Sequence, residues 1–473
     1  MMSQRLDSLE RARREPLAEH ALLALLASLE RETFTDAAQL ARFHDALLYF
    51  CAYPTTPRVL KRAESILKRF GSRVRALDDS WPLMDPEVSG ISRTSVTIVF
   101  SYDFVRWLIS RYPDDVTIDW EQGYDSERMA AVLPLVIPML AEEARVDANV
   151  DYRRWLKGRG VQWLVSQLER LPNAAALYDS IGLWIRWDLR NASTRTALRW
   201  PKKEIFYSEA APLPRREVSI ASALEGKPLR IRRLSRRAGE AALDLARATL
   251  AVRYRELYGF TYGDASTVLS ADCGRGLEIL LVGITKDRRL PLRAGFAPLL
   301  IRNGVPIGYG DAFGLCERME VSLNIFYAFR DGESAFCFAQ MLKLYHQIFG
   351  SEVFSIDPYQ IGMENEEAIE SGAFWFYRKL GFRCADPVIE RLAQHEEARL
   401  EVQPSVRTSA RTLRKLARGP MVYGPKAWDR FRIGNLARTI SSDVLRRVHA
   451  RRDLVSMAKD ADLRRTLIEL GSV

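Results

Sequence analysis

Several features that would mark a membrane or secreted protein are missing from the sequence. No run of about 18 uncharged apolar residues occurs, so no membrane-spanning helix is predicted. The first residues, Met1–Arg14, are strongly charged and contain no apolar core of the kind found in secretory signals. These two absences predict a cytoplasmic protein.

Metal sites and common catalytic motifs are also missing. The chain has five cysteines and five histidines, and none of them has the spacing of metal ligands. We therefore expect no metal and reduced, mostly buried thiols. A P-loop, a G-x-S-x-G elbow and a G-x-G-x-x-G turn are absent as well. The cysteines are Cys51, Cys273, Cys316, Cys337 and Cys384.

What is present is a chain of 473 residues with an uneven charge. Its length predicts two or three domains. Residues 404–473 contain 16 Lys/Arg and 6 Asp/Glu, so this segment accounts for the whole formal net charge of +10. A basic segment can bind the phosphates of nucleic acid or an anionic membrane surface. A solvated face that pairs with acids elsewhere in the chain is the favoured alternative.

The hydrophobic pattern of the first half predicts two regions. Residues 1–77 have helical periodicity and form a helical module without evident chemistry. Residues 78–225 form a mixed α/β region that is rich in tryptophan, which we interpret as core packing rather than as an aromatic pocket. Within it we expect strands at Val96–Phe100 and Val116–Trp120, and helices that include Ala174–Leu189.

The second half predicts a mixed sheet flanked by helices and followed by a basic helical tail. Residues 226–388 have the order β-α-β-β-β-β-α-β-α, and residues 389–473 continue with helices. The expected strands are 229–234, 277–284, 298–302, 305–313, 319–329 and 353–357, and the expected helices are 238–258, 332–349 and 366–380. Asn303-Gly304 predicts a tight hairpin turn. The fold class predicted for the chain is therefore α/β with a mixed sheet.

One segment of this region resembles a known family. Ala373–Phe382 reads AFWFYRKLGF and is similar to the A-x-x-F-Y-x-K-x-G-F ending of the last core helix in the GNAT-like acyl-CoA N-acyltransferases. The resemblance covers residues 228–387, about one third of the chain. It implies that Tyr377 is a general acid that protonates the departing thiolate, because a tyrosine with a pKa near 10 keeps its proton at neutral pH. Tyr377 as a packing residue is the alternative.

The segment Phe329–Ala335 is similar to the family's Q/R-x-x-G-x-G/A loop. The resemblance implies that main-chain N–H groups around Phe329, Arg330, Gly332 and Ser334 hold the pyrophosphate of acetyl-CoA or another acyl-CoA. Phe329 replaces the family's Gln or Arg, and the acids Asp331 and Glu333 would repel a pyrophosphate. A simple helix cap is the alternative for this loop.

The resemblance also implies a base and a second cofactor contact. Glu320 lies on the expected long strand and is the candidate base for an attacking amine, with Asp311 and Glu317 as competitors. Surface strand acids are the alternative. Glu370 occupies the position where many members of the family have Asn, and Asn365 is the nearby substitute. Asn365 can equally be a helix cap.

The resemblance implies transfer of an acyl group from an acyl-CoA to the amine of a small molecule or a protein. Transfer from an aminoacyl-tRNA is a variant on the same fold. A non-catalytic scaffold that contacts nucleic acid, a membrane surface or a protein through residues 404–473 is the other hypothesis. Nearly the whole chain also resembles bacterial proteins of unknown activity that share the segment Ala368–Tyr377.

Overall fold

The computed structural model describes residues 2–86, 88–142, 150–190, 193–208, 210–403, 405–451 and 453–472. The described residues do not include Met1, Pro404 and Val473, which begin or end segments predicted from the sequence. The chain divides into two compact units, and each is described by itself. Unit 1 consists of residues 1–200 and 243–261, and unit 2 of residues 201–242 and 262–473. The finer division predicted at residues 77, 225 and 388 stays a prediction.

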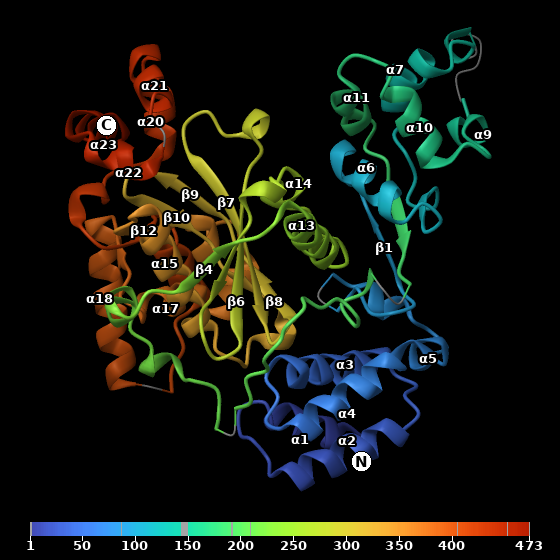
Figure 1. The fold of residues 1–473 in the computed structure, drawn as a ribbon, viewed down its shortest axis with the longest axis horizontal. Coiled ribbons are helices and arrows are strands. Elements are labelled where there is room, and N and C mark those ends of the chain that lie inside the picture. The colour runs from blue at the N-terminus through green and yellow to red at the C-terminus, as the bar shows by residue number, and fades with distance from the viewer. Residues whose placement is uncertain are drawn as a thin grey trace. The chain divides into compact units, whose positions relative to one another are not determined.

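Unit 1 begins with a group of helices that pack on one another (Figure 1). Helix α3 is buried along most of its length, and Asp36 caps its start by accepting hydrogen bonds from the N–H groups of Ala38 and Gln39. Unit 1 contains α1 (Met2–Arg11), α2 (Glu19–Arg31), α3 (Ala37–Ala52), α4 (Pro57–Lys68), α5 (Phe70–Arg75), η1 (Trp81–Met84), β1 (Ser95–Ile98), α6 (Tyr102–Arg111), β2 (Val116–Ile118), α7 (Ser126–Val136), α9 (Tyr152–Trp155), α10 (Gly160–Leu168), α11 (Ala174–Ile181), β3 (Ile185–Asp188) and α14 (Tyr258–Thr261).

The three strands of unit 1 form an antiparallel sheet in the order β1-β3-β2. The predicted helix over Ala174–Leu189 is therefore wrong in its second half. Helix α11 ends at Ile181, Gly182 takes a left-handed conformation with φ of 65°, and the chain continues as the central strand. Ile185 and Trp187 are buried and alternate with more exposed neighbours, which is the period of a strand. They belong to a core that includes most of the tryptophans of this region, as the sequence predicts.

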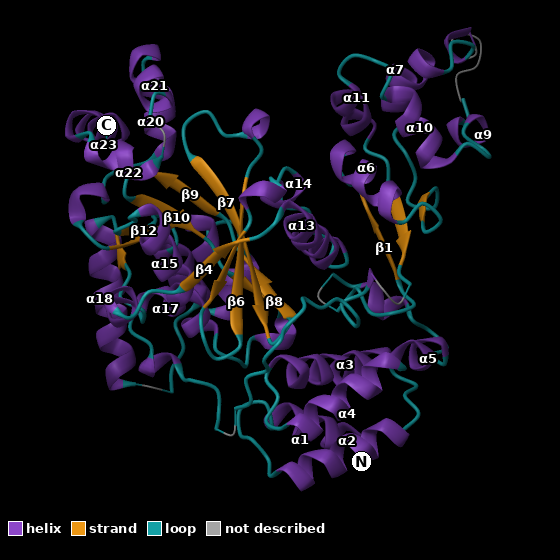
Figure 2. Cartoon of the chain, viewed as in Figure 1, coloured by secondary structure: helices purple, strands orange, loops and turns teal. Residues whose placement is uncertain are grey.

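Unit 2 is built on one large sheet, which Figure 2 shows as a strongly twisted set of strands. Helix α13 (Arg236–Ala251) begins in unit 2, and its residues from 243 onward belong to unit 1. Unit 2 further contains η3 (Arg215–Glu217), α12 (Ile220–Glu225), β4 (Arg230–Arg233), η4 (Ala265–Thr267), β5 (Leu269–Asp272), β6 (Leu277–Gly283), η5 (Lys286–Arg288), β7 (Ala294–Arg302), β8 (Val305–Tyr309), β9 (Ala312–Leu315), β10 (Arg318–Val321), β11 (Asn324–Ile325), η6 (Tyr327–Phe329), α15 (Ser334–Phe349), β12 (Val353–Ile356), η7 (Pro358–Ile361), α16 (Glu366–Ser371), α17 (Ala373–Arg378), β13 (Arg383–Cys384), α18 (Pro387–Val402), α19 (Ala410–Leu416), β14 (Met421–Tyr423), η8 (Lys426–Trp428), α20 (Ile433–Thr439), α21 (Ser442–His449), α22 (Leu454–Lys459) and α23 (Ala461–Gly471).

The strands of this sheet follow the order β13-β14-β12-β10-β9-β7-β6-β5-β4, with β8 paired to β7 and β11. Neighbours are antiparallel except β10 and β12, which are parallel, so the sheet is mixed. The mixed α/β fold class is thus confirmed. Asn303 and Gly304 have φ of 48° and 82°, and they form the predicted hairpin turn between β7 and β8.

Three of the expected elements are interrupted. The strand expected over 319–329 is two short strands, β10 and β11, followed by η6. The helix expected over 366–380 is split at Gly372, whose φ of 67° ends α16 before α17 begins. The helix expected over 238–258 ends at Ala251, because Tyr254 adopts a positive φ of 57°. The first two interrupted elements contain Glu320 and Tyr377, the residues that the family resemblance implies to be catalytic.

Candidate functional site

The parallel strands β10 and β12 stay paired only over their first residues. The register runs from Arg318 opposite Val353 to Glu320 opposite Ser355. After Val321 the chain that follows β10 pairs on its other side, where Ser322 N–H donates to Asp311 C=O at 2.9 Å and Phe326 N–H donates to Ile307 C=O at 3.0 Å.

The hydrogen bonds of Ser322 and Phe326 fix the direction of the main-chain groups that lie between these two residues. Neighbouring residues in a strand direct their N–H and C=O groups to opposite edges. The main-chain groups of Leu323 and Ile325 therefore point away from β8, toward the edge that β12 has left. The result is a short stretch of strand edge that β12 does not cover.

Tyr377 lies at this edge. Its side chain is 3% exposed, and its ring contacts those of Phe338, Phe376 and Phe382. Burial raises the pKa of the Tyr377 hydroxyl, and only the backbone N–H of Leu323, which donates to this hydroxyl, acts against that rise. Tyr377 is therefore protonated at neutral pH and is held by a main-chain group of the uncovered edge.

Two of the three acids considered as bases are held by cations. The Glu320 carboxylate is 2.9 Å from Arg293 and 3.4 Å from Arg318. The Glu317 carboxylate accepts a hydrogen bond of 2.6 Å from the Trp428 indole and a second from Arg464. Each carboxylate is therefore already engaged by other side chains of the fold.

Asp311 is the third acid, and its surroundings differ. No ion pair or side-chain hydrogen bond reaches its carboxylate within the described part of the chain, and burial raises the pKa of Asp311 to about 6. The Asp311 N–H donates to the Ser322 hydroxyl at 2.9 Å, and its C=O accepts from the Ser322 N–H. Because Leu323 follows Ser322 directly, Asp311 and Tyr377 contact adjacent residues of the same strand segment from opposite edges.

The loop before α15 connects to the same edge. Arg330 stacks over the ring of Tyr327 at 3.6 Å and donates from Nε to Ile325 C=O at 3.3 Å. It also pairs with Glu367. Phe329 is buried, and Gly332 N–H donates to Phe329 C=O at 3.0 Å, so the loop is a compact turn that ends at Ser334, the first residue of α15.

Glu333, which would repel a pyrophosphate if its charge were free, is buried between two arginines. Arg302 Nη1 lies 2.7 Å from its carboxylate, Arg275 pairs with it as well, and the N–H of Leu213 donates to it at 3.1 Å. Burial alone would raise the pKa of Glu333, but the two guanidinium groups hold it below its ordinary value. The charge of Glu333 is therefore neutralised inside the protein and does not face the loop.

Asn365 has the alternative role that its sequence suggests. Its side-chain oxygen accepts from Ala368 N–H at 3.1 Å at the start of α16, and its amide donates to Tyr359 C=O at 3.0 Å. Both ends of the side chain are therefore used within the chain. The structure gives Asn365 the geometry of an N-cap.

The described residues thus bring Tyr377, Arg330 and Asp311 to one strand segment. Glu320 is engaged by arginine side chains, and Asn365 is engaged by main-chain groups. Sequence reasoning missed Leu323 because its contribution is a main-chain N–H, which has no residue signature. It also missed the partners of Glu333, since Arg275 lies in the turn between β5 and β6 and Arg302 lies at the end of β7. The signal available for Asp311 was its place after Gly310, between two short strands.

Other predicted features are placed as follows. All five cysteines are free and buried, and no group of three or more His, Cys, Asp or Glu that could hold a metal occurs in the part that the structure describes. None of the helices among the described residues is long and apolar enough to span a membrane. Several arginines of the basic segment pair with acids, including Arg414 with Glu366 and Arg447 with Asp462. Binding of nucleic acid or an anionic surface by this segment stays a prediction.

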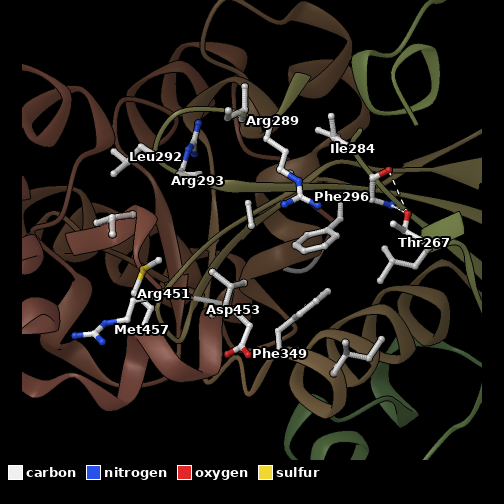
Figure 3. Close-up of a pocket in the computed structure, with 18 of the residues that line it drawn as sticks. Thr267, Ile284, Arg289, Leu292, Arg293, Phe296, Phe349, Arg451, Asp453 and Met457 are labelled. Carbon is white, nitrogen blue, oxygen red and sulfur yellow. Dashed lines mark hydrogen bonds between the residues drawn. The ribbon is translucent and has the colours of Figure 1, made fainter. Parts of the chain in front are cut away.

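A cavity of about 430 Å³ lies elsewhere in unit 2, and none of the predicted site residues lines it (Figure 3). Its nearest link to them is Arg293, which lines the cavity and also pairs with Glu320. Comparison of the chain with protein-family models, with curated proteins and with solved structures finds no match.

Proposed function

We propose that unit 2 transfers an acyl group from an acyl-CoA to an amine. The observation that carries the proposal is the uncovered strand edge at Leu323–Ile325, which has the Tyr377 hydroxyl hydrogen-bonded to it. The resemblance of Ala373–Phe382, which contains Tyr377, to the GNAT-like acyltransferases supports the same interpretation.

The residues present fit such a co-substrate. The two outward-facing main-chain groups that Tyr377 and Arg330 do not use, Leu323 C=O and Ile325 N–H, are partners for the amides of a pantetheine arm, because an extended chain can pair with a free strand edge. The N–H groups at the start of α15, from Ser334 onward, are suited to an anionic pyrophosphate, and the neutralised Glu333 does not oppose it. Arg330 lies at the end of the same edge and supplies a cation. The thioester would supply the activated acyl group.

The roles of the side chains follow from their environments. Asp311, with a pKa of about 6, is an ionised and unpaired base at neutral pH and can take the proton that an attacking amine must lose. Tyr377, whose pKa is raised by burial, keeps its proton and can give it to the departing thiolate. Glu320, the base expected from the sequence, would instead position Arg293 and Arg318. The buried free thiols are compatible with the cytoplasmic location that the sequence predicts.

The test is thermal melting of the full chain with acetyl-CoA, decanoyl-CoA, free CoA and, as a polyphosphate control, ATP. A ligand present at about 100 times its dissociation constant adds roughly 2.7 kcal/mol to the free energy of unfolding and so raises the melting temperature. We expect at least one CoA compound to do this and ATP not to. No shift with any CoA compound, or an equal shift with ATP, would contradict the proposal.

A further inference from the structure

The cavity of about 430 Å³ in unit 2 has a volume typical of pockets that hold small molecules. It is formed by the ends of β6 and β7, the loop between them, the last turn of α15, and helices α21 and α22. The His449 Nε2–H donates to Pro291 C=O at 2.6 Å, so the loop is tied to α21. The loop, the sheet and the helices thus enclose the cavity from three sides.

The inner walls are apolar and include two aromatic rings in contact with each other. The centroids of Phe296 on β7 and Phe349 on α15 are 4.3 Å apart, and both rings face the pocket in Figure 3. Ile284 and Met457 extend the apolar surface on either side. Such walls favour an aliphatic or aromatic ligand body, because its burial removes apolar surface from water.

The rim is rich in arginine, and its arginines differ in how they are used. Arg293 is paired with Glu320, and Arg451 is paired with Asp460. Arg289 is different: among the described residues no hydrogen bond or ion pair engages its guanidinium group. Figure 3 shows the Arg289 side chain reaching over the pocket toward Phe296. Arg233, a second lining residue, makes only a long hydrogen bond of 3.4 Å to Ser266 C=O.

One acid, Asp453, also lines the cavity. Its carboxylate accepts a hydrogen bond of 2.7 Å from Ser456 N–H and caps the start of α22, so its charge is already stabilised by the helix end. Arg289 interacts with the Asp264 carboxylate only at longer range, and Arg233 makes no ion pair among the described residues. These two arginines therefore give the pocket a positive charge, which favours an anionic ligand.

We propose that this cavity binds a small amphiphilic carboxylate, with the apolar chain against Phe296 and Phe349 and the carboxylate on Arg289. The site is separate from the acyl-transfer site and does not depend on it. A carboxylate fits the planar fork of an arginine, and a medium-length chain fits the enclosed volume.

The experiment is isothermal titration calorimetry of the full chain with decanoate, decan-1-ol and decylamine as probes. We expect decanoate to bind with one site per chain, decanol to bind at least about tenfold more weakly, and decylamine to show no binding at this site, since a charge-assisted hydrogen bond is lost or opposed. Affinity should rise about fourfold for each added CH₂ from butyrate to decanoate, because each group is buried against the apolar walls.

Arg289→Met keeps an apolar stem and removes the charge, and it should weaken decanoate binding at least about tenfold. The matched control is Arg288→Met. Arg288 is the neighbouring residue, lies over the ring of Tyr262 and does not line the cavity, so its loss should leave decanoate binding unchanged. Absence of decanoate binding, equal binding of decanoate and decanol, or equal losses in both variants would overturn the proposal.

Discussion

Each unit buries a group of ionisable side chains, and the two groups are built differently. In unit 1, His44 Nε2 lies 2.8 Å from the Thr196 hydroxyl, and Asp45 lies 3.1 Å from Arg195. Burial lowers the pKa of His44 to about 4, so the ring is neutral at physiological pH. For Asp45, burial alone would raise the pKa, but Arg195 and His44 outweigh it and keep the carboxyl ionised. The Asp45 and Arg195 charges are therefore paired, and His44 and Arg195 are buried.

In unit 2, Asp311 is half-buried and has no counter-ion in the described part of the chain. It adjoins a strand segment whose main-chain groups are uncovered on one edge. The comparison teaches that burial of a charge is not sufficient to indicate a site. A paired group contributes to the fold, whereas an unpaired group costs stability and can react. Three substitutions test this difference.

The largest effect is expected for Asp45→Asn, because it leaves the Arg195 guanidinium buried without its counter-ion. Removal of one partner of a buried pair costs about 3–5 kcal/mol of the free energy of unfolding. The measurement is urea unfolding of the full chain followed by circular dichroism. The control is Asp7→Asn, which removes an exposed partner of Arg42 and should cost no more than about 1 kcal/mol. Equal losses in the two variants would show that the cluster of unit 1 is no more than a surface pair.

Asp311→Asn should act in the opposite direction. The folded-state pKa of about 6 is above that of an unfolded aspartate, so the folded protein binds this proton more tightly and wild-type stability falls as pH rises from about 4 through 6. Asparagine removes this penalty, and the variant should be more stable than wild type at pH 8 by about 2–3 kcal/mol. The same substitution should lower acyl transfer at least about a hundredfold.

Urea unfolding at pH 4 and pH 8 measures the change for Asp311→Asn. The difference between variant and wild type should be small at pH 4 and large at pH 8. A variant that is less stable than wild type at pH 8 would show that Asp311 has a stabilising partner and would remove the contrast between the two units.

Local patterns in the sequence predict the fold well where local energetics decide it. The Asn303-Gly304 turn and the helix that became α15 needed only residues next to one another. The predicted helix Ala174–Leu189 failed because β3 is stabilised between β1 and β2, partners about 70–90 residues away along the chain. Long-range pairing overrides propensity in such short segments.

The candidate site was predictable only in part, for the same reason. The motif around Tyr377 identified a residue whose hydroxyl does reach the strand edge. The motif could not reveal that Glu320 on β10 is held by Arg293, which lies in the loop before β7 and far away along the chain. Nor could it show that Asp311, one of three acids, is the unpaired one. Charge pairing is a property of the folded chain, and one sequence does not specify it.

The smallest effect is expected for Tyr377→Phe, and it sharpens the comparison within unit 2. The Tyr377 hydroxyl accepts from Leu323 N–H, so its removal should cost about 1 kcal/mol of the free energy of unfolding. Tyr345, which lies on α15, is the matched control. Like Tyr377 it is buried, but its hydroxyl has no hydrogen-bond partner among the described residues. Tyr345→Phe should therefore leave stability unchanged or raise it slightly, because it removes an unsatisfied buried polar group.

If acyl transfer falls in Tyr377→Phe and not in Tyr345→Phe, the hydroxyl on the strand edge acts in the reaction. Equal activity of the two variants with wild type across the pH range would reduce Tyr377 to a packing residue, and the uncovered edge would lose its proposed acid.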